Sequence, residues 1–249
     1  MTRIIAMSNH KGGVGKTTST LNIGAALTKL GQRVLLVDMD PQANLSQSMG
    51  FEDTEYSIYG ALRGKHELIP YQVIENLDLI PSTLELSAVE IELSAEAGRE
   101  YIFKELLAPH LDSYDFVFID CPPSLGLLTI NALTAANEVF IPLQAHYLPL
   151  RGLTKITEVI DKIRKRLNPT LKIGGVFVTQ FDNRKVLMRD VADSIKEYFN
   201  ENVFKSKIRD NIALAEAPTG GVDIFRYDPK SHGAEDYMEL AKEILKNKF

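Results

Sequence analysis

The sequence has 249 residues, a formal net charge of −5 at pH 7, a hydrophobic fraction of 45% and a charged fraction of 24%. These values are ordinary for a globular protein with a large buried core, and they exclude a polycation, so any binding of nucleic acid must come from a local basic patch. The single cysteine, Cys121, excludes a disulfide framework and fits a reducing cytosol, and no apolar run approaches the roughly 20 residues that span a bilayer.

Short β-rich runs alternate with helical periodicity along the whole chain. Several runs are continuously apolar, for example Val34–Val37 and Phe116–Ile119, as strands are when helices cover both faces of a parallel sheet. The predicted fold is therefore α/β, a doubly wound, mostly parallel sheet flanked by helices, in one domain over residues 1–249. The predicted strands are Arg3–Ser8, Arg33–Asp38, Leu77–Pro81, Phe116–Asp120, Val139–Pro142, Ile173–Thr179 and Val203–Ile208.

A glycine-rich loop joins the first predicted strand to a helix that is expected to begin at about Lys16. Glycines let backbone N–H groups approach phosphate oxygens, and the start of the helix adds its positive dipole end. Lys16 would contact the β- and γ-phosphates of ATP, and the Thr17 hydroxyl would ligate Mg²⁺. His10 stands where the standard P-loop has its first glycine, so the strict motif fails at that one position. The predicted ATP-binding residues are Lys11, Gly12, Gly13, Val14, Gly15, Lys16, Thr17 and Thr18.

Lys11 is the unusual feature of this loop. If Lys11 and Lys16 both contacted one triphosphate, they would compete with Mg²⁺ for the same phosphate oxygens. Lys11 therefore either crosses into the site of a second subunit, where it would stabilise transition-state charge as an arginine finger does, or lies exposed at the rim of the loop. The residues alone leave both alternatives open.

Two later strands end in aspartates, as strands around a phosphate loop often do. Asp38 and Asp40 lie two residues apart at the end of the second strand, so both would point to the same side if the strand persists. A carboxylate at this place would orient the attacking water or hold a water of the Mg²⁺ shell. Asp120 ends the apolar strand before Cys121 in the Walker B arrangement, which holds Mg²⁺ directly or through water, and Ser124–Gly126 begin a loop that would respond to the γ-phosphate.

The loop Lys11–Thr18 resembles the deviant Walker A motif of the ParA/MinD group of ATPases. The chain is similar to ParA/Soj-type partition ATPases over essentially its whole length, including Asp40–Asn44, Pro122–Ser124, Ile208–Pro218 and Arg226–Ala234. The resemblance implies an ATP hydrolase that uses ATP and Mg²⁺ and is slow without an activating partner.

The same resemblance implies residue roles. Lys11 would act across a homodimer, Lys16 would bind phosphate, and Asp40 would position the hydrolytic water. Thr17, Asp120 and Asp40 would form the Mg²⁺ site. Arg209 and Asn211 would lie near the nucleoside. Many relatives have a basic residue for DNA at the position of Ala213, so that particular contact is in doubt here.

A basic patch is predicted near the carboxyl-terminal third of the chain. Lys205, Lys207 and Arg209 alternate along one predicted strand and so share a face. Such a patch would bind DNA phosphates without reading sequence and would be sensitive to salt. The alternative is that these lysines guard an edge strand against pairing, with nearby acids diluting the field. The predicted DNA-binding residues are Arg184, Lys185, Arg189, Lys205, Lys207 and Arg209.

The predicted function is an ATP-dependent DNA segregation ATPase. ATP would close a homodimer that binds double-stranded DNA non-specifically, and a ParB-like centromere-binding protein would stimulate hydrolysis and release. The protein would be cytoplasmic and associated with the nucleoid. Larger partition ATPases carry a helix-turn-helix segment before the first strand. This sequence has no such segment there, so sequence-specific operator binding is not expected.

Two other classes of protein share a loop of this kind. A MinD-like membrane ATPase would need a basic amphipathic carboxyl-terminal helix, but the polar face of the last helix carries Asp236, Glu239 and Glu243, and its apolar stripe suits core packing, so no membrane partner is expected. A metabolic enzyme sharing the loop would be a nitrogenase-reductase type, which needs several cysteines, or an ATP-dependent carboxylate-activating synthase, whose turnover would depend on a small substrate.

Overall fold

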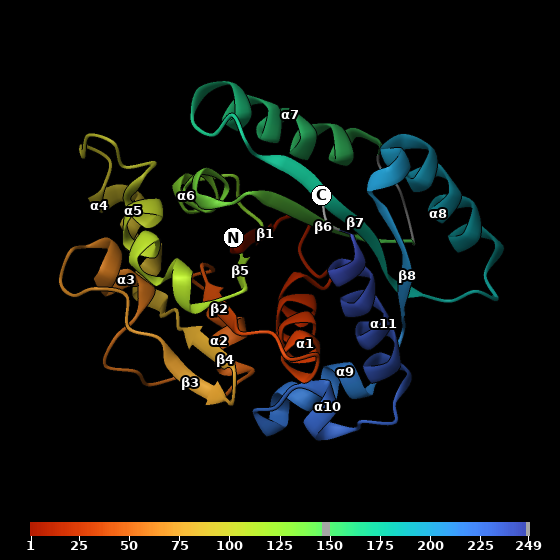
Figure 1. Cartoon of the computed structure of the whole chain (residues 1–249). Coiled ribbons are helices and arrows are strands. Elements are labelled where there is room, and N and C mark those ends of the chain that lie inside the picture. Colours follow the sequence, from red (N-terminus) through yellow and green to blue (C-terminus); the bar gives the residue numbers. More distant parts are fainter. Residues whose placement is uncertain (146–149, 248–249) are drawn as a thin grey trace.

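The computed structural model describes residues 1–145 and 150–247, with the backbone alone for 150–155. The described residues form an eight-stranded sheet in the order β3-β4-β2-β5-β1-β6-β7-β8, with helices on both faces (Figure 1). The strands are β1 Arg3–Met7, β2 Val34–Asp38, β3 Tyr71–Ile74, β4 Leu77–Ile80, β5 Phe116–Asp120, β6 Glu138–Gln144, β7 Lys172–Phe181 and β8 Val203–Arg209. All neighbouring strands run parallel except β3 and β4. The predicted doubly wound, mostly parallel α/β fold is confirmed.

Most of the helices lie between successive strands of the chain, and the last three follow β8. They are α1 Lys16–Lys29, α2 Asn44–Gln47, α3 Ile58–Leu62, α4 Val89–Glu92, α5 Ile102–Leu107, α6 Leu127–Ala135, α7 Leu150–Arg166, α8 Val186–Phe199, α9 Ala213–Glu216, α10 Ile224–Tyr227 and α11 His232–Lys246. Short 3₁₀ segments are η1 Leu84–Ala88, η2 Ala108–Ser113, η3 Asn200–Asn202 and η4 Ala217–Gly220. Within residues 1–145 and 150–247, every helix falls short of the length and apolar character needed to cross a bilayer.

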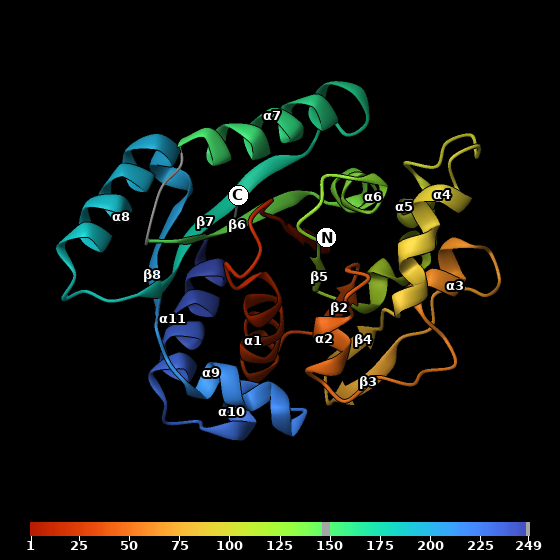
Figure 2. The ribbon, with the colours of Figure 1, turned by 180° about the vertical axis from the view of Figure 1, so that it is seen from behind.

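The strand β5 illustrates why both faces of the sheet need cover. Successive side chains of a strand point to opposite faces, so Val117 and Ile119 enter the core beneath α5 to α8, while Phe116 and Phe118 enter the core beneath α1 and α11. Figures 1 and 2 show the two helical layers, with α6 and α7 on one side of the sheet and α1 and α11 on the other. The continuous apolar runs in the sequence are the direct result of this double burial.

Two differences from the predicted elements have simple causes. The strand β3 was missed because its four residues are partly exposed and pair only on one side, antiparallel to β4, through a tight turn in which Asn76 takes a φ of 64°. The strands β6 and β7 run further than predicted, because Gln144 of β6 still pairs with Thr179 and Phe181 of β7 still pairs with Arg209 of β8.

The carboxyl ends of the central parallel strands meet at one edge of the sheet. Asp38, at the end of β2, lies in register with Asp120, at the end of β5, and Met7 of β1 lies in register with Asp120 on its other side. Ligands of open α/β sheets bind at this edge. The fold therefore places the predicted phosphate loop and the predicted acids in one neighbourhood.

Candidate functional site

The phosphate loop leaves β1 and turns tightly into α1. Gly13 has a φ of 70° and Gly15 a φ of 85°, left-handed values that glycine adopts without steric cost. Val14 between them is buried, whereas the space next to the Cα atoms of Gly12 and Gly13 is open. The helix begins at Lys16, as predicted, and its first N–H groups face the loop. The backbone thus forms an open cradle of donors suited to an anion.

The two lysines of the loop take different directions. Lys16 is 8% exposed, and its Nζ lies 3.5 Å from the carbonyl oxygen of Lys11, beneath the loop. Lys11 is exposed, and its Nζ donates to Gln144 Oε1 at 3.1 Å. Only Lys16 therefore sits where it would meet the phosphates of its own subunit's nucleotide, and Lys11 is held outside that position.

Thr17 and Asp120 form the metal side of the site. The Thr17 hydroxyl donates to Asp120 Oδ2 at 2.6 Å, and among the described residues the buried Asp120 Oδ1 has no hydrogen-bond partner. Burial raises the pKa of Asp120 well above its ordinary value, the neighbouring Asp38 raises it further, and Thr17 and Lys16 oppose the shift. A buried carboxylate with one bare oxygen beside a hydroxyl is a suitable ligand pair for a hard cation.

Mg²⁺ fits these residues. No three His, Cys, Asp or Glu side chains of the described residues gather as a ready-made metal cage, and proteins usually hold Mg²⁺ through one or two carboxylates together with substrate phosphates. Thr17 and Asp120 supply a hydroxyl and a carboxylate of this kind, and the loop beside them supplies the place for phosphate. The ion would also favour the ionised form of Asp120.

Asp38 and Asp40 do not act as a matched pair. The prediction that both side chains point to one side required the strand to persist, but β2 ends at Asp38. Asp38 Oδ2 accepts from Ser46 N at 2.8 Å and from Ser46 Oγ at 2.7 Å, and Asp38 Oδ1 accepts from Asp40 N at 3.2 Å. Burial raises the pKa of Asp38 to about 6, although these hydrogen bonds oppose the shift. Asp38 is thus a buried anchor of the turn that carries Asp40.

Asp40 lies on the turn that follows. It is 8% exposed, and its Oδ1 accepts from Gln42 N at 3.0 Å. Ser82 Oγ donates to the Asp40 carbonyl at 2.8 Å and so ties this turn to the segment after β4. The carboxylate keeps acceptor capacity beyond the Gln42 bond, so it remains available for a water molecule.

The segment after Asp120 begins buried and becomes exposed at Pro123 and Ser124. Cys121 is fully buried, and burial raises the pKa of its thiol, so the side chain stays protonated at neutral pH and packs as a small apolar group. Gly126 precedes α6, and a side chain at this position would collide with the carboxylate of Glu90. Within the predicted phosphate-responsive loop, Ser124 is exposed and Gly126 lies against the Glu90 side chain of the α4 segment.

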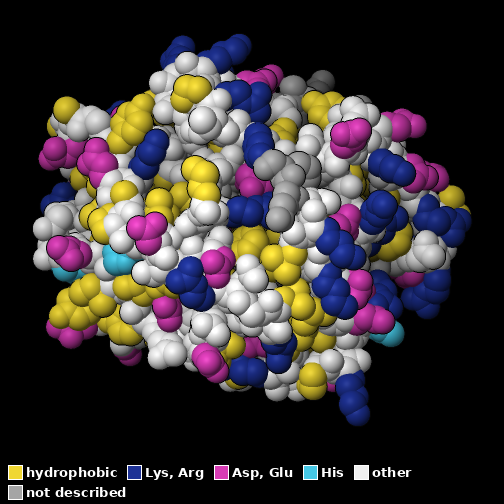
Figure 3. Space-filling model, in the orientation of Figure 1, with side chains coloured by type: hydrophobic (Ala, Val, Ile, Leu, Met, Phe, Trp, Pro, Cys, Tyr) yellow, Lys and Arg dark blue, Asp and Glu magenta, His cyan; other side chains and the backbone are white. Residues whose placement is uncertain are grey.

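The predicted DNA-binding side chains lie together on the edge of the sheet. Arg184, Lys205, Lys207 and Arg209 line one open pocket between β7 and β8, and Lys185 and the Arg189 side chain are exposed at the start of α8. Figure 3 shows Lys and Arg gathered over the side that carries α8 and β8, with Asp and Glu between them.

Two members of this basic patch differ in their pairing. Arg184 donates to both carboxylate oxygens of Asp182, at 2.9 and 3.0 Å, and this bond lowers the pKa of Asp182 to about 2. Lys205 is exposed and Phe204 and Ile208 are buried, so the predicted alternation of the strand is correct. Charges on the exposed side of β8 are thus partly neutralised and partly available.

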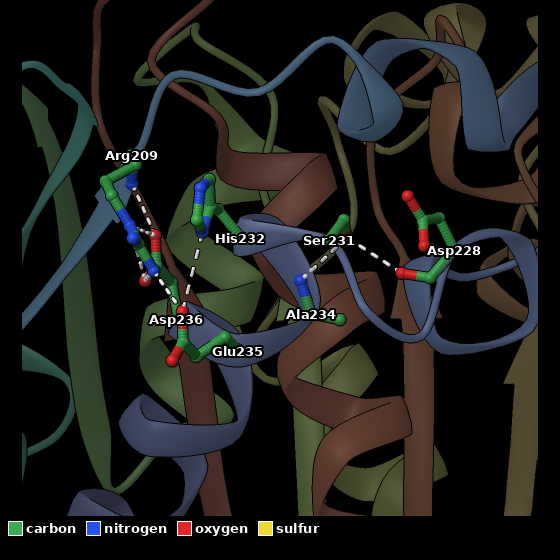
Figure 4. A network of polar contacts seen from close by, with 7 residues as sticks. All are labelled: Arg209, Asp228, Ser231, His232, Ala234, Glu235 and Asp236. Carbon is green, nitrogen blue, oxygen red and sulfur yellow. Dashed lines mark hydrogen bonds and ion pairs between the residues drawn. The ribbon is translucent and has the colours of Figure 1, made fainter.

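Arg209 is more strongly held than the other cations of the patch. Its guanidinium donates to Asp236 at 2.6 Å and to Glu235 at 2.5 Å, and its backbone N–H donates to Asp236 Oδ2 at 2.8 Å (Figure 4). Figure 4 also shows Ser231 capping the start of α11 through Ala234 N. Asn211 Oδ1 accepts from Ala213 N at 2.8 Å and so supports the start of α9. Both predicted nucleoside residues therefore have structural contacts of their own.

The acidic face of α11 has a task that the sequence did not indicate. Glu243 accepts from the backbone N–H groups of Lys205 and Ser206, and Asp236 accepts from Arg209, so two of the three acids serve the exposed edge strand β8. The apolar stripe of α11 is buried as predicted, and the Tyr237 hydroxyl lies 2.9 Å from Ser19 Oγ on α1.

Sequence reasoning missed Gln144 and Gln180. Gln144 Nε2 and Gln180 Nε2 both donate to the Gly13 carbonyl, at 2.7 and 3.3 Å. Thr179 Oγ1 donates to the Val14 carbonyl at 2.9 Å. The available signal was their position, since each is a polar residue at the carboxyl end of an apolar strand, where ligands of such sheets bind.

Comparison with known proteins agrees with this geometry. A family model described as an AAA domain matches residues 2–173. The chain is 46% identical over 252 residues to the sporulation initiation inhibitor protein Soj of Bacillus subtilis, covering 99% of this chain and 100% of that protein. It is 44% identical to the chromosome-partitioning ATPase Soj of Treponema pallidum, covering 98% of both chains.

A solved structure is also similar over nearly its whole length. It is cobyrinic acid a,c-diamide synthase from Mycobacterium smegmatis with bound ADP and magnesium, which superposes with a TM-score of 0.87 at 38% identity. The match covers 99% of this chain and 95% of that chain.

Proposed function

The chain belongs to the Soj/ParA family of chromosome-partitioning P-loop ATPases, and from this membership we propose that it is an ATP-driven DNA segregation switch. In this proposal residues 1–249 act as one P-loop ATPase domain that binds Mg·ATP at Lys11–Thr18 and hydrolyses ATP to ADP and phosphate. Turnover is slow until an activating partner binds. The name of the Treponema pallidum relative, a chromosome-partitioning ATPase, supports the partition role, and the ADP and magnesium of the similar mycobacterial structure support the ligands.

One observation carries the proposal. Buried Lys16, the Thr17 hydroxyl and the bare Asp120 Oδ1 converge beneath an open glycine loop, which is an arrangement for a phosphate group with its metal ion. Lys16 binds the β- and γ-phosphates, and Thr17 and Asp120 hold Mg²⁺, whose charge offsets that of the phosphate oxygens. Asp40 orients the attacking water and contacts the shell of the ion.

The dimer in this proposal depends on Lys11. Its exposed ammonium group is held away from the interior that Lys16 occupies. ATP closes two protomers face to face, and each Lys11 crosses to the partner's triphosphate and stabilises charge there in trans. Nucleotide state thereby sets the oligomeric state, which is how a phosphate group controls a larger assembly.

The DNA-binding surface is assigned to the basic patch of Arg184, Lys185, Arg189, Lys205 and Lys207. Dimerisation doubles this patch, so an acidic chain gains affinity for double-stranded DNA in the ATP form. We place Arg209 at the margin of the patch, where its ion pairs with α11 leave it the least available of these cations. A ParB-like centromere-binding protein stimulates hydrolysis and thereby releases the DNA. In its ATP form the protein is bound to the nucleoid, in the cytoplasm.

The proposal is tested by comparing DNA binding with ATP, with ADP and without nucleotide, across a salt series. Binding to an arbitrary duplex is expected only with ATP, and log Kd should rise linearly with log salt concentration. Equal binding in all three nucleotide states would contradict the switch.

The packing of α11 argues against the alternative of a MinD-like membrane ATPase. A membrane-binding helix needs a free apolar face, but Tyr237, Leu240, Ala241 and Ile244 of α11 are buried against α1 and the sheet. Binding of this helix to anionic vesicles would require it to leave the core, and pelleting with such vesicles is expected to be absent.

The second candidate is an ATP-dependent carboxylate-activating synthase, which the name of the similar mycobacterial structure favours. Its ATP turnover would depend on a small carboxylate substrate and an amine donor. A metabolite screen separates the two candidates, because the segregation ATPase is stimulated by a protein partner and DNA and not by a metabolite.

A further inference from the structure

Two glutamine side chains at the ends of β6 and β7, Gln144 and Gln180, donate hydrogen bonds to the phosphate loop. Gln144 Nε2 donates to the Gly13 carbonyl at 2.7 Å and to Gln180 Oε1 at 2.6 Å. Gln180 Nε2 donates to the same Gly13 carbonyl at 3.3 Å. The Gly13 oxygen thus accepts from both amides, and the amides are joined to each other. We call this arrangement the amide clamp.

The backbone at Gln180 supports a specific role for the clamp. Gln180 has a φ of 51°, in the left-handed region that residues with a side chain rarely adopt. Such a conformation persists only where surrounding contacts fix it. The neighbours provide this fixation, because Phe181 is buried and Thr179 Oγ1 donates to the Val14 carbonyl. The strained residue is the one whose amide contacts the loop.

Holding the carbonyl groups of the loop also orients its donors. In a planar trans peptide, the C=O of one residue and the N–H of the next point in opposite directions. Fixing the carbonyl groups of Gly13 and Val14 against β6 and β7 therefore turns the N–H groups of Val14 and Gly15 away from those strands. These N–H groups are the donors that a phosphate group requires, so before a nucleotide binds the amide clamp sets the direction of the Val14 N–H and Thr179 sets that of the Gly15 N–H.

Gln144 has a second partner in Lys11. Lys11 Nζ donates to Gln144 Oε1 at 3.1 Å, so the oxygen and the nitrogen of this one amide are both engaged. A lysine held in this way lies against its own subunit. It must leave Gln144 before its ammonium group reaches a neighbour's nucleotide.

We propose that Gln144 is a positioning residue with two tasks. Together with Gln180 it presets the phosphate loop for the triphosphate, and through its Oε1 it stores Lys11 within its own subunit until a second protomer approaches. The second task rests on the proposed function, because it assumes that Lys11 acts across a dimer. The first task does not.

The presetting of the loop is tested with the full chain carrying Lys11→Ala, which removes any effect of Lys11 storage. Gln144→Met and Gln180→Met keep the side-chain length and remove the amide. Each is expected to weaken the binding of Mg·ATP about fivefold to tenfold, because one or two hydrogen bonds that orient the loop are lost. The measurement is a fluorescence titration with ATP. Unchanged affinity in both variants would overturn this task.

The storage of Lys11 is tested in the Asp40→Ala background with saturating ATP, by stopped-flow light scattering. Gln144→Met is expected to speed association severalfold relative to Gln180→Met, because only Gln144 holds Lys11. Gln144→Glu keeps an acceptor of the same length and adds a charge, so it is expected to associate more slowly than the Asp40→Ala parent. Equal rates for the two methionine variants, or a fast glutamate variant, would overturn storage.

The two failures are distinguishable. If the Asp40→Ala parent itself stays monomeric with ATP, the proposed function fails, while the titrations in the Lys11→Ala background still report on the amide clamp. Thermal melting of each nucleotide-free variant verifies folding, and a variant that is unfolded is replaced by Gln→Leu at the same position, with the same expected direction.

Discussion

The magnesium side of the nucleotide site and the basic patch, which lies on β8, on α8 and in the loop before α8, carry opposite charges in opposite surroundings. Asp38 and Asp120 are fully buried, and hydrogen bonds fix the position of each carboxylate. Lys205 and Arg184 are exposed, and solvent and salt screen their charges. In the buried region each carboxylate oxygen has its own hydrogen-bond partner or its own place for a ligand. In the exposed region the cations would act on DNA through their total positive charge.

This difference determines the size of the effect that each region should show on mutation. A change in the buried site removes a specific contact in a low-dielectric environment, where such contacts are strong. A change in the exposed patch removes one of several interchangeable charges. Substitutions in the buried site should therefore have larger effects than substitutions in the patch.

Lys16→Ala is expected to abolish measurable binding of ATP, with a loss of at least about 100-fold in affinity. Lys16 is buried beneath the loop, so no other side chain of the same charge replaces it there. Isothermal titration with Mg·ATP measures the loss. The matched control is Lys242→Ala, which removes an exposed cation that pairs with Glu239 and should leave affinity unchanged. Retained tight binding by Lys16→Ala would remove Lys16 from the site.

The buried acids are expected to make the nucleotide-free protein less stable as the pH rises. The pKa of Asp38 is raised to about 6 in the folded state and that of Asp120 is raised as well. A raised acid pKa contributes stability that is complete below the unfolded value near 4 and is lost as the pH rises through the folded value. For Asp38 alone the loss is about 3 kcal/mol between pH 4 and pH 7.

Chemical unfolding in the presence of EDTA, from pH 4.5 to pH 7.5, measures this loss. Acids whose pKa is lowered, such as Asp115 and Asp182, complete their titration at lower pH and do not mask it. Asp120→Asn keeps the acceptor for Thr17 and removes the charge, so it should be more stable than the parent at pH 7.5 and fail to bind Mg·ATP. A free energy of unfolding that rises steadily over this window would contradict the assignment.

Arg209 lies at the boundary between the buried region and the exposed basic patch. It belongs to the basic patch by sequence, but its pairing with the mostly buried Asp236 makes it structural. Arg209→Ala removes the guanidinium and leaves that carboxylate only the backbone N–H of residue 209, so it is expected to lower the free energy of unfolding by about 1–3 kcal/mol. Thermal melting measures the effect, and Lys205→Ala, which removes an exposed side chain of the same strand, is the control. Equal melting temperatures of Arg209→Ala and Lys205→Ala would mean that Arg209 is an ordinary exposed cation of the patch.

The smallest expected effects belong to single lysines of the patch. Lys205→Ala and Lys207→Ala should each weaken DNA binding of the ATP form about threefold to tenfold and lower the slope of log Kd against log salt by about 1. The effect should be the same for unrelated duplex sequences. Lys104→Ala, on the distant helix α5, should change neither quantity. A loss confined to one DNA sequence would mean that these residues read bases.

The contrast also explains what the sequence could predict. Lys16, Thr17 and Asp120 were predictable because each has a fixed place relative to a strand end or a glycine turn, and the structure brings them together. The continuous apolar strands predicted the doubly wound sheet for the same reason, since double burial leaves a clear pattern. Local chain geometry was sufficient in these cases.

Other features depend on contacts between distant segments and have no local pattern. Gln144 meets Gly13 across 131 residues, and Glu243 meets Ser206 across 37. The role of Asp38 as an anchor depends on Ser46, which a strand pattern does not reveal. The sequence could not show whether Arg209 is paired or solvated. The alternation of side chains along a strand predicts which face Arg209 lies on, and it does not predict that Asp236 is its partner.

The most direct test of the account is the mass of the Asp40→Ala variant in solution with ATP and Mg²⁺, measured by light scattering. The variant is expected to bind ATP without hydrolysing it and to form a stable dimer, and the Lys11→Ala, Asp40→Ala double variant is expected to bind ATP and remain monomeric. A single variant that stays monomeric with ATP bound, or a double variant that dimerises equally well, would contradict the exchange of Lys11 between two nucleotide sites.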